Sequence, residues 1–180
     1  DGRWVYVTAE ATHTVTVVDT TDASVVKHIL VGNRPRVVEF STDGTRAYVT
    51  AEIGGTVSVI DAATKEIKHK ITFEIPGIRS ESIQPVGVRI TDDGSKAYVA
   101  LGPANRIAVI DGNTYEVLDY LLVGQRVWQL AFSPDQTHLF TTNGISNDIS
   151  IIDVAADKVI KSVQVTEVTP GESADIVASV

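Results

Sequence analysis

Val57-Ser58-Val59-Ile60-Asp61 is one of four strand-like runs of branched apolar residues that end in aspartate. The other three runs are residues 15–19, 107–111 and 149–153, so the closing aspartates recur at intervals of 42, 50 and 42 residues. A period of about 42 residues with several short strands is typical of a β-propeller, in which radially arranged sheets bury their faces against one another. The sequence therefore predicts an all-β propeller of four-stranded antiparallel blades, with about four blades in this chain.

The second repeat shows all four strands of a blade, at residues 35–40, 46–50, 56–61 and 66–73. Aligning the other copies on it predicts a single domain with repeats 3–31, 32–73, 74–123 and 124–165 and a tail at 166–180. The first repeat lacks its first strand, and residues 174–180 resemble one. Three arrangements stay open: a ring closed by that tail, a homodimer of two four-blade arcs, and part of a longer propeller. Closure matters because it removes exposed sheet edges.

Several recurring residues have structural interpretations. A carboxylate that accepts from backbone N–H groups two or three residues later fixes a turn, and we interpret the four closing aspartates in this way rather than as catalytic. An aromatic at a fixed place in each second strand, Tyr6, Tyr48, Tyr98 and Phe140, suits packing between blades. The hairpin turns at 41–44 and 91–94 end in glycine, whereas Gln136 ends the third, so we expect a looser turn there.

Composition excludes several classes. Lysine and arginine number 15 against 23 aspartates and glutamates, a formal charge of −8, so nucleic acid and anionic membranes are not expected partners. No apolar stretch approaches the roughly 20 residues of a spanning helix. Cysteine is absent, which removes disulfides, thiolate metal sites and haem-attachment pairs. The start at Asp1, without an initiator or signal peptide, indicates a processed or excised piece.

No catalytic or metal-binding pattern occurs in the sequence, and we predict neither a metal nor a cofactor in this chain. Propellers bind ligands on loop surfaces, and the loops that lead from one blade into the next are the first candidate surface. The 50-residue interval places about eight extra residues in one of these loops, and insertions on a repeat scaffold often mark the binding face. Guanidinium groups there suit a small anionic ligand or an acidic partner, and a tryptophan suits a partner anchor. The predicted binding residues are Arg34, Arg36, Arg79, Gln84, Arg126 and Trp128.

Two structural alternatives apply to these residues: the arginines could bond loop carbonyls or acidic neighbours, and Trp128 could pack in the core. The loops between second and third strands, at 10–13, 52–55, 102–106 and 143–148, form a second candidate surface. Their glycine, asparagine and proline residues chiefly satisfy turn geometry.

The run Tyr48-Val49-Thr50 followed by residues 56–61 resembles the propeller repeats named for a Tyr-Val-Thr-Asn strand. Residues 52–165 are more specifically similar to the C-terminal half of a bacterial propeller family associated with pyrroloquinoline-quinone (PQQ)-dependent catabolism. Six segments carry this similarity in order: 52–56, 73–77, 83–87, 100–106, 120–128 and 142–148. Only about half of a full propeller is present, and the tail after Val165 departs from the family pattern.

The resemblance implies a periplasmic or extracellular, non-enzymatic binding or scaffold protein linked to quinoprotein alcohol oxidation. Its partner would be a quinoprotein dehydrogenase or a cytochrome, and any quinone or haem would reside on that partner. A cell-surface or surface-layer repeat protein is the alternative. A lactonase-like propeller enzyme ranks third, because it needs acidic and amide side chains in one channel.

Overall fold

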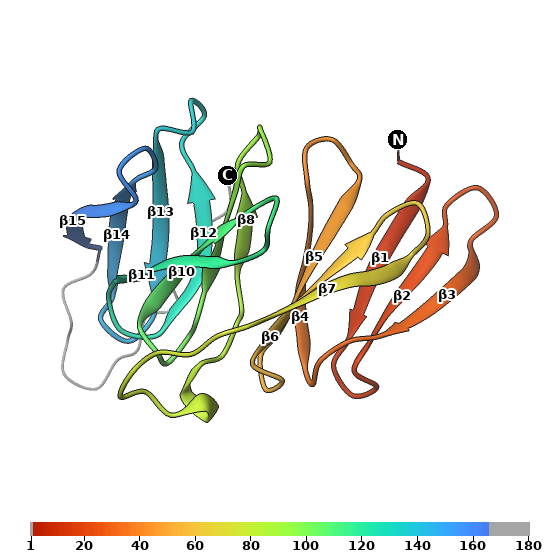
Figure 1. Cartoon of the computed structure of the whole chain (residues 1–180), viewed down its shortest axis with the longest axis horizontal. Helices are drawn as coiled ribbons and strands as arrows, with labels where there is room; N and C mark the ends of the chain where they lie inside the picture. The colour runs from red at the N-terminus through yellow and green to blue at the C-terminus, as the bar shows by residue number, and fades with distance from the viewer. Residues whose placement is uncertain (1, 166–180) are drawn as a thin grey trace.

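β-Strands dominate the described part of this chain, residues 2–165 of a computed structural model (Figure 1). They form four antiparallel sheets in chain order, which we call blades 1 to 4. Blade 1 contains β1 (Trp4–Ala9), β2 (Thr14–Asp19) and β3 (Ser24–Leu30), and blade 2 contains β4 (Pro35–Phe40), β5 (Arg46–Ala51), β6 (Thr56–Asp61) and β7 (Glu66–Thr72). Blade 3 contains β8 (Val88–Ile90), β9 (Lys96–Ala100), β10 (Arg106–Asp111) and β11 (Val117–Leu122). Blade 4 contains β12 (Val127–Phe132), β13 (His138–Asn143), β14 (Asp148–Asp153) and β15 (Lys158–Gln164).

The propeller prediction is confirmed, with three four-stranded blades and a three-stranded first blade. The inner strands β4, β8 and β12 follow one another along the arc, and β1 lies beside β4. Figure 1 shows blade 1 and blade 4 at opposite ends of this arc. The strand predicted at 174–180 lies outside the described residues, and the repeat boundaries given above remain our proposal.

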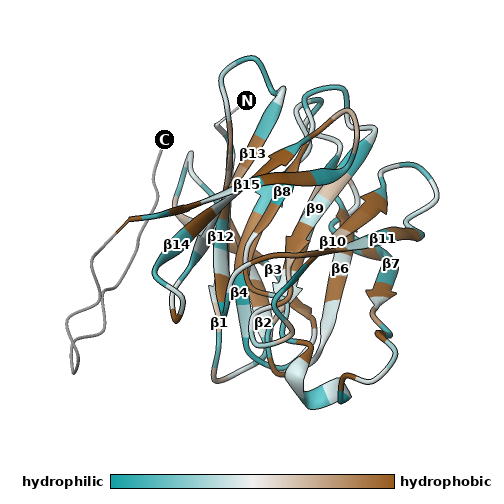
Figure 2. Cartoon of the chain, turned by 90° about the vertical axis from the view of Figure 1, so that its left-hand side faces the viewer, coloured by the Kyte–Doolittle hydropathy of each residue, from teal (hydrophilic) through white to brown (hydrophobic). Residues whose placement is uncertain are grey.

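The core lies between blades rather than within them, because each sheet is one layer thick and must bury both faces against its neighbours. Figure 2 shows hydrophobic residues concentrated along the strands. Each of blades 2 and 3 turns one face toward the preceding blade and the other toward the following one. Ala47 and Val49 of β5 pack on blade 1, whereas the neighbouring Tyr48 packs on blade 3. Tyr98 repeats this arrangement between blades 3 and 4. The predicted packing between blades is thus confirmed for Tyr48 and Tyr98, whereas Phe140 of blade 4 is only partly buried.

A threonine in the second strand ties the blades together near the hub. The inner strand β4 carries a bulge, and Thr50 Oγ1 accepts from the unpaired Val37 N–H at 3.1 Å. The same hydroxyl donates to Val86 O of the next blade at 2.7 Å. Thr142 accepts from Gln129 N–H at 3.1 Å in blade 4. A buried backbone N–H at a bulge has no partner in the neighbouring strand and needs another acceptor. The threonine hydroxyl is that acceptor at the point where the inner strand bends.

The turns behave as predicted, with one exception. Asp61 Oδ1 accepts from the N–H groups of Ala63 and Thr64 at 3.0 and 2.8 Å, and the equivalent aspartates make similar turn bonds. The looser turn expected at Gln136 is wrong. Its φ of 55° and its bond to Ser133 O at 2.8 Å match Gly44, whose φ is 68° and whose bond to Ser41 O is also 2.8 Å. The turn tolerates this strain because Asp135 accepts from both the N–H and the Oγ1 of Thr137, and these two bonds hold the backbone in the tight conformation.

The hairpin aspartates should make stability depend on pH in the acid range. Hydrogen bonds hold the pKa of Asp43, Asp93 and Asp135 at about 2, below the ordinary 3.8, with the hydroxyls of Ser41, Thr91 and Ser133 the largest causes. A depressed folded-state pKa contributes stability that is present above about pH 4 and is lost as pH falls toward 2. Urea midpoints measured from pH 5 to pH 2 should fall steeply. In D43N/D93N/D135N the urea midpoint should depend less steeply on pH. An unchanged dependence in that variant would contradict the claim that these three aspartates cause the loss of stability in acid.

Candidate ligand-binding face

The sequence predicted two candidate surfaces: the loops that lead from one blade into the next, and the loops between second and third strands. Both sets of loops lie on one face of the propeller, along the lower edge in Figure 1. Antiparallel strands reverse direction at every turn, so each inner strand begins where its neighbouring second strand ends. Backbone bonds join the two sets: Glu52 N–H donates to Arg34 O at 2.9 Å, and Gly144 N–H donates to Arg126 O at 3.0 Å. We call this the loop face: residues 10–13, 31–34, 52–55, 73–87, 101–105, 123–126 and 144–147.

Arg34 and Arg36 form an ion-pair cluster at the junction of blades 1 and 2. Arg34 Nε lies 3.1 Å from Glu10 Oε2 and 3.4 Å from Glu52 Oε2, and Arg36 Nε lies 3.3 Å from Glu52 Oε2. Arg36 also pairs with Glu10. Hydrogen bonds from Arg34, then from Arg36, lower the pKa of Glu10. Two guanidinium groups therefore meet two carboxylates, and the cluster has no net charge.

Glu52 is the buried member of this cluster, with a side chain only 3% exposed. Within residues 2–165 its Oε2 has no well-directed hydrogen bond, so charge attraction from the two arginines is what holds it. A buried carboxylate without paired charge is strongly unfavourable. The two arginines here are thus neutralising structural groups, which is the alternative that the sequence left open.

A hollow of about 390 Å³ opens beside the cluster. Its lining residues are Glu10, Ala11, His13, Asn33, Arg34 and Ile53. His13 adopts a positive φ of 58°, and its Nδ1 accepts from Arg34 N–H at 3.3 Å. The hollow therefore combines a carboxylate, an imidazole and a guanidinium, which are groups that can bind an anion or move a proton.

Arg126 and Trp128 form a different arrangement at the junction of blades 3 and 4. The guanidinium of Arg126 lies 4.7 Å from the centroid of the Trp128 ring, and its backbone N–H donates to Asn105 Oδ1 at 2.8 Å. Trp128 is half-buried against the core between these blades. Within residues 2–165 the Arg126 guanidinium has no carboxylate partner. An aromatic ring beneath a cation fixes its position without cancelling its charge.

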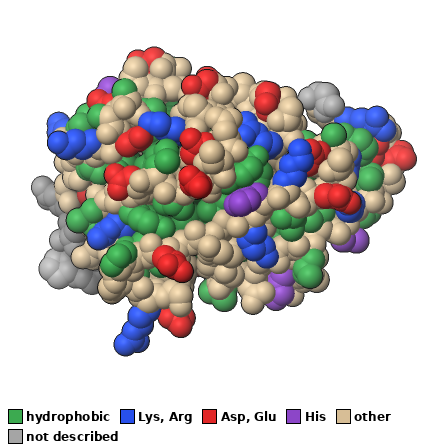
Figure 3. All heavy atoms as spheres, viewed as in Figure 1, with side chains coloured by type: hydrophobic (Ala, Val, Ile, Leu, Met, Phe, Trp, Pro, Cys, Tyr) green, Lys and Arg blue, Asp and Glu red, His purple; other side chains and the backbone are tan. Residues whose placement is uncertain are grey.

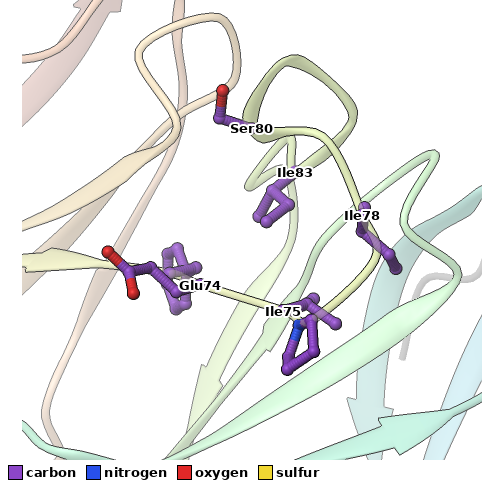
Figure 4. A pocket seen from close by; sticks show the side chains of 7 residues that line it. Glu74, Ile75, Ile78, Ser80 and Ile83 are labelled. Carbon is purple, nitrogen blue, oxygen red and sulfur yellow. The ribbon is translucent and has the colours of Figure 1, made fainter.

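The inserted loop 73–87 lies at the junction of blades 2 and 3. Arg79 precedes the short 3-10 helix η1 (Ser80–Ser82), is exposed, and has no side-chain partner among the described residues. Gln84 donates from Nε2 to Glu81 O at 2.9 Å. Figure 4 shows the side chains of Ile75, Ile78 and Ile83 around an open hollow of about 360 Å³, with Glu74 and Ser80 at its rim.

The structure places all six predicted residues on or beside the loop face, but at three successive junctions rather than in one cluster. Arg34 and Arg36 meet the same two glutamates, Arg79 and Gln84 both belong to the inserted loop 73–87, and Arg126 contacts Trp128. The second and third groups are joined through loop 101–105, since Gln84 N–H donates to Leu101 O and Asn105 accepts from Arg126. Figure 3 shows basic and acidic side chains interspersed on the viewed side, without one dominant basic field.

Sequence reasoning missed Glu10, His13 and Glu52. A signal was present: Thr-Ala-Glu occurs at both 8–10 and 50–52, in the same place of two repeats. The glutamates were overlooked because they come from the second loop set, which was not expected to meet the first. Among the described residues, no three His, Asp or Glu side chains group as metal ligands, and no helix is long and apolar enough to cross a bilayer.

Comparison with known proteins identifies the family. The model of the lactonase seven-bladed β-propeller family matches residues 26–157, which is most of the chain. The chain belongs to this family. The residues matched run from β3 into the turn before β15, so they include all of blades 2 and 3.

Two solved structures are similar to this lactonase-family propeller. Kuenenia stuttgartiensis hydrazine synthase has a TM-score of 0.80 and 26% identity, covering 90% of this chain and 46% of that one. Dihydro-heme d1 dehydrogenase NirN, in complex with DHE, has a TM-score of 0.75 and 20% identity, covering 92% and 35%, and this likeness shows the fold alone. The chain thus spans less than half the length of either structure. No curated protein matches its sequence.

Proposed function

We propose that this chain is a non-enzymatic recognition module whose loop face binds an acidic protein partner. The carrying observation is the Arg126–Trp128 pair, in which a guanidinium without a carboxylate partner in the described residues is fixed over a half-buried ring. Arginine and tryptophan are enriched among the residues that dominate interface energies. Arg79 adds a second cation that no described carboxylate neutralises, on the same connected surface, whereas Arg34 and Arg36 are already paired.

The apolar hollow of the inserted loop supports the same proposal. Ile75, Ile78 and Ile83 line a concave surface next to Arg79. An apolar side chain of the partner seated there, flanked by its carboxylates on Arg79 and Arg126, would combine a desolvated anchor with charged contacts at the rim. Small anions with an apolar body have the same chemistry and would compete for the site.

The partner class in this proposal is a quinoprotein alcohol dehydrogenase or its cytochrome, in the periplasm or outside the cell. Its support is the similarity of six sequence segments to the PQQ-associated propeller family and the Tyr-Val-Thr repeat at residues 48–50. Cofactor chemistry would belong to the partner, and the propeller would hold or orient it.

Surface plasmon resonance with purified dehydrogenase and cytochrome tests this proposal. Charge reversal in R79E/R126E should weaken binding at least ~10-fold and reduce its salt dependence, because rim charges act mainly through steering and screening. Lys158→Glu, an exposed cation at the start of β15, is the matched control and should bind as the parent does. Unchanged binding by R79E/R126E would refute the loop face as the site. A surface-layer repeat protein, the other alternative, would bind neither partner.

Lactone hydrolysis is a second candidate function for two reasons. The family model that matches is a lactonase model, and the hollow lined by Glu10, His13 and Arg34 contains groups that can move a proton. There the imidazole or carboxylate could take a proton from water as it adds to the lactone carbonyl, and the ring would open to a hydroxy acid. A pH-stat assay on a simple δ-lactone distinguishes the candidates. Turnover lost in His13→Ala but kept in R79E/R126E would favour the enzyme.

A further inference from the structure

The inserted loop 73–87 builds a hollow from its own residues. All seven residues that line the hollow belong to this loop. Ile78 N–H donates to Ile75 O at 3.0 Å, which closes a turn inside the loop. Ile83 is only 3% exposed and packs with Phe73 in the core between blades 2 and 3. The packing and the turn hold the hollow open in advance of any ligand, as is usual for binding sites.

The walls of this hollow are apolar, and its polar groups lie at the rim. Five apolar side chains form the walls: Phe73, Ile75, Pro76, Ile78 and Ile83. Figure 4 shows the rim residue Glu74 on the side of the hollow opposite Ile78. An apolar cavity with a few placed polar groups is the usual form of a ligand site, and the volume of about 360 Å³ lies in the usual range. An aliphatic chain fits walls of this kind.

The charge at the rim is negative. Glu74 is the one charged residue among the seven, and its backbone N–H donates to Tyr120 Oη at 3.1 Å, which ties it to β11. Glu74 is exposed, and within residues 2–165 it forms no ion pair. Arg79 follows Ile78 in the chain but does not line the hollow. The site therefore joins an apolar slot to a carboxylate that no described cation neutralises.

We propose that this hollow binds a lysine side chain of the protein partner, with the stem along the isoleucines and the ammonium at Glu74. Lysine buries its aliphatic stem on apolar surface while its charged end stays at a polar rim. Its ammonium is a compact charge on a flexible four-carbon stem. The inference rests on the proposed function, because it names the anchor that the partner seats in the hollow. Carboxylates of the partner would meet Arg79 and Arg126 outside it.

n-Butylammonium, which has the stem and charge of a lysine side chain, tests the proposal on the protein alone. Its titration, followed by methyl NMR, should give saturable shifts of the Ile75, Ile78 and Ile83 methyl groups. n-Butanol has the same stem without the charge and should bind about fivefold more weakly, the upper end for an exposed ion pair. In Glu74→Gln the two probes should bind equally, because the substitution removes the charge and keeps the walls.

Glu116→Gln is the matched control, since Glu116 is an exposed carboxylate in the turn directly before β11. It should bind both probes as the parent does. Equal affinity of the parent chain for butylammonium and butanol would overturn the proposal. Tighter binding of butyrate than of butylammonium would overturn it as well.

Competition in surface plasmon resonance separates this inference from the proposed function. At constant ionic strength, butylammonium should weaken binding of the dehydrogenase or cytochrome more than butanol does. Partner binding that R79E/R126E weakens but butylammonium leaves unchanged would overturn the lysine anchor and keep the proposed function. A parent chain that prefers butylammonium but binds neither partner would refute the proposed function and keep the inferred ammonium selectivity of the hollow.

Discussion

Tyr98→Ala should lower the free energy of unfolding by about 3–5 kcal/mol, the range for truncating a buried aromatic ring to alanine. Tyr98 is fully buried between blades 3 and 4, with its ring centroid 5.9 Å from that of Phe132. Because stability resides between blades, the cavity would separate two sheets rather than loosen one. Urea unfolding followed by circular dichroism measures the change. A loss below about 1 kcal/mol would show that blades 3 and 4 are not held together by this ring.

Tyr98→Phe and Tyr48→Phe measure the contribution of each tyrosine hydroxyl to stability separately from that of its ring. Tyr98 Oη donates to Asp157 Oδ1 at 2.6 Å, and burial followed by this bond raises the pKa of Tyr98. Tyr98→Phe should therefore cost about 1.5–3 kcal/mol, as for hydrogen bonds to charged groups. Tyr48, at the same place in blade 2, is equally buried, and its hydroxyl has no partner in the described residues. Tyr48→Phe should be neutral or stabilising, because it removes a buried polar group that is unsatisfied.

The double variant R34M/R36M should destabilise the protein by about 3 kcal/mol, the lower end of the range for breaking a buried ion pair. The reason is Glu52, whose carboxylate would stay buried after losing both cations. The lower end applies because the arginine side chains are themselves 45% and 29% exposed, so water screens part of the attraction.

Glu52→Gln provides the rescue. In the R34M/R36M background it removes the uncompensated charge, so the triple variant should recover most of the lost stability. Thermal unfolding of the parent, double and triple variants forms the comparison, with Glu52→Gln alone completing the cycle. If Glu52→Gln deepened the loss in R34M/R36M, the carboxylate would not be the group that the arginines neutralise.

Much of the candidate face could be located from the sequence, and its internal pairing could not. The 50-residue interval located the inserted loop, and the position before each inner strand located Arg34, Gln84 and Arg126. Yet sequence spacing alone did not separate the paired Arg34 from Arg126, which has no carboxylate partner in the part of the chain that the structure describes. That difference depends on Glu10 and Glu52, which approach from the second loop set only because antiparallel strands return to the same face.

Gln136 illustrates the same limit on a smaller scale. Local propensity favours glycine in a left-handed turn, and the glutamine predicted a looser one. The aspartate and threonine on either side hold the backbone in the tight form, so local hydrogen bonds outweighed the preference of one residue.

By itself the sequence determined the blade: its length, its four strands and the residues that close its turns, because strand alternation and turn chemistry act over a few residues. Only the tertiary structure decided which charges are neutralised and that the two loop sets share one face. These properties depend on distances between residues far apart in the chain, and a repeat pattern specifies the unit without specifying which side chains of different units meet.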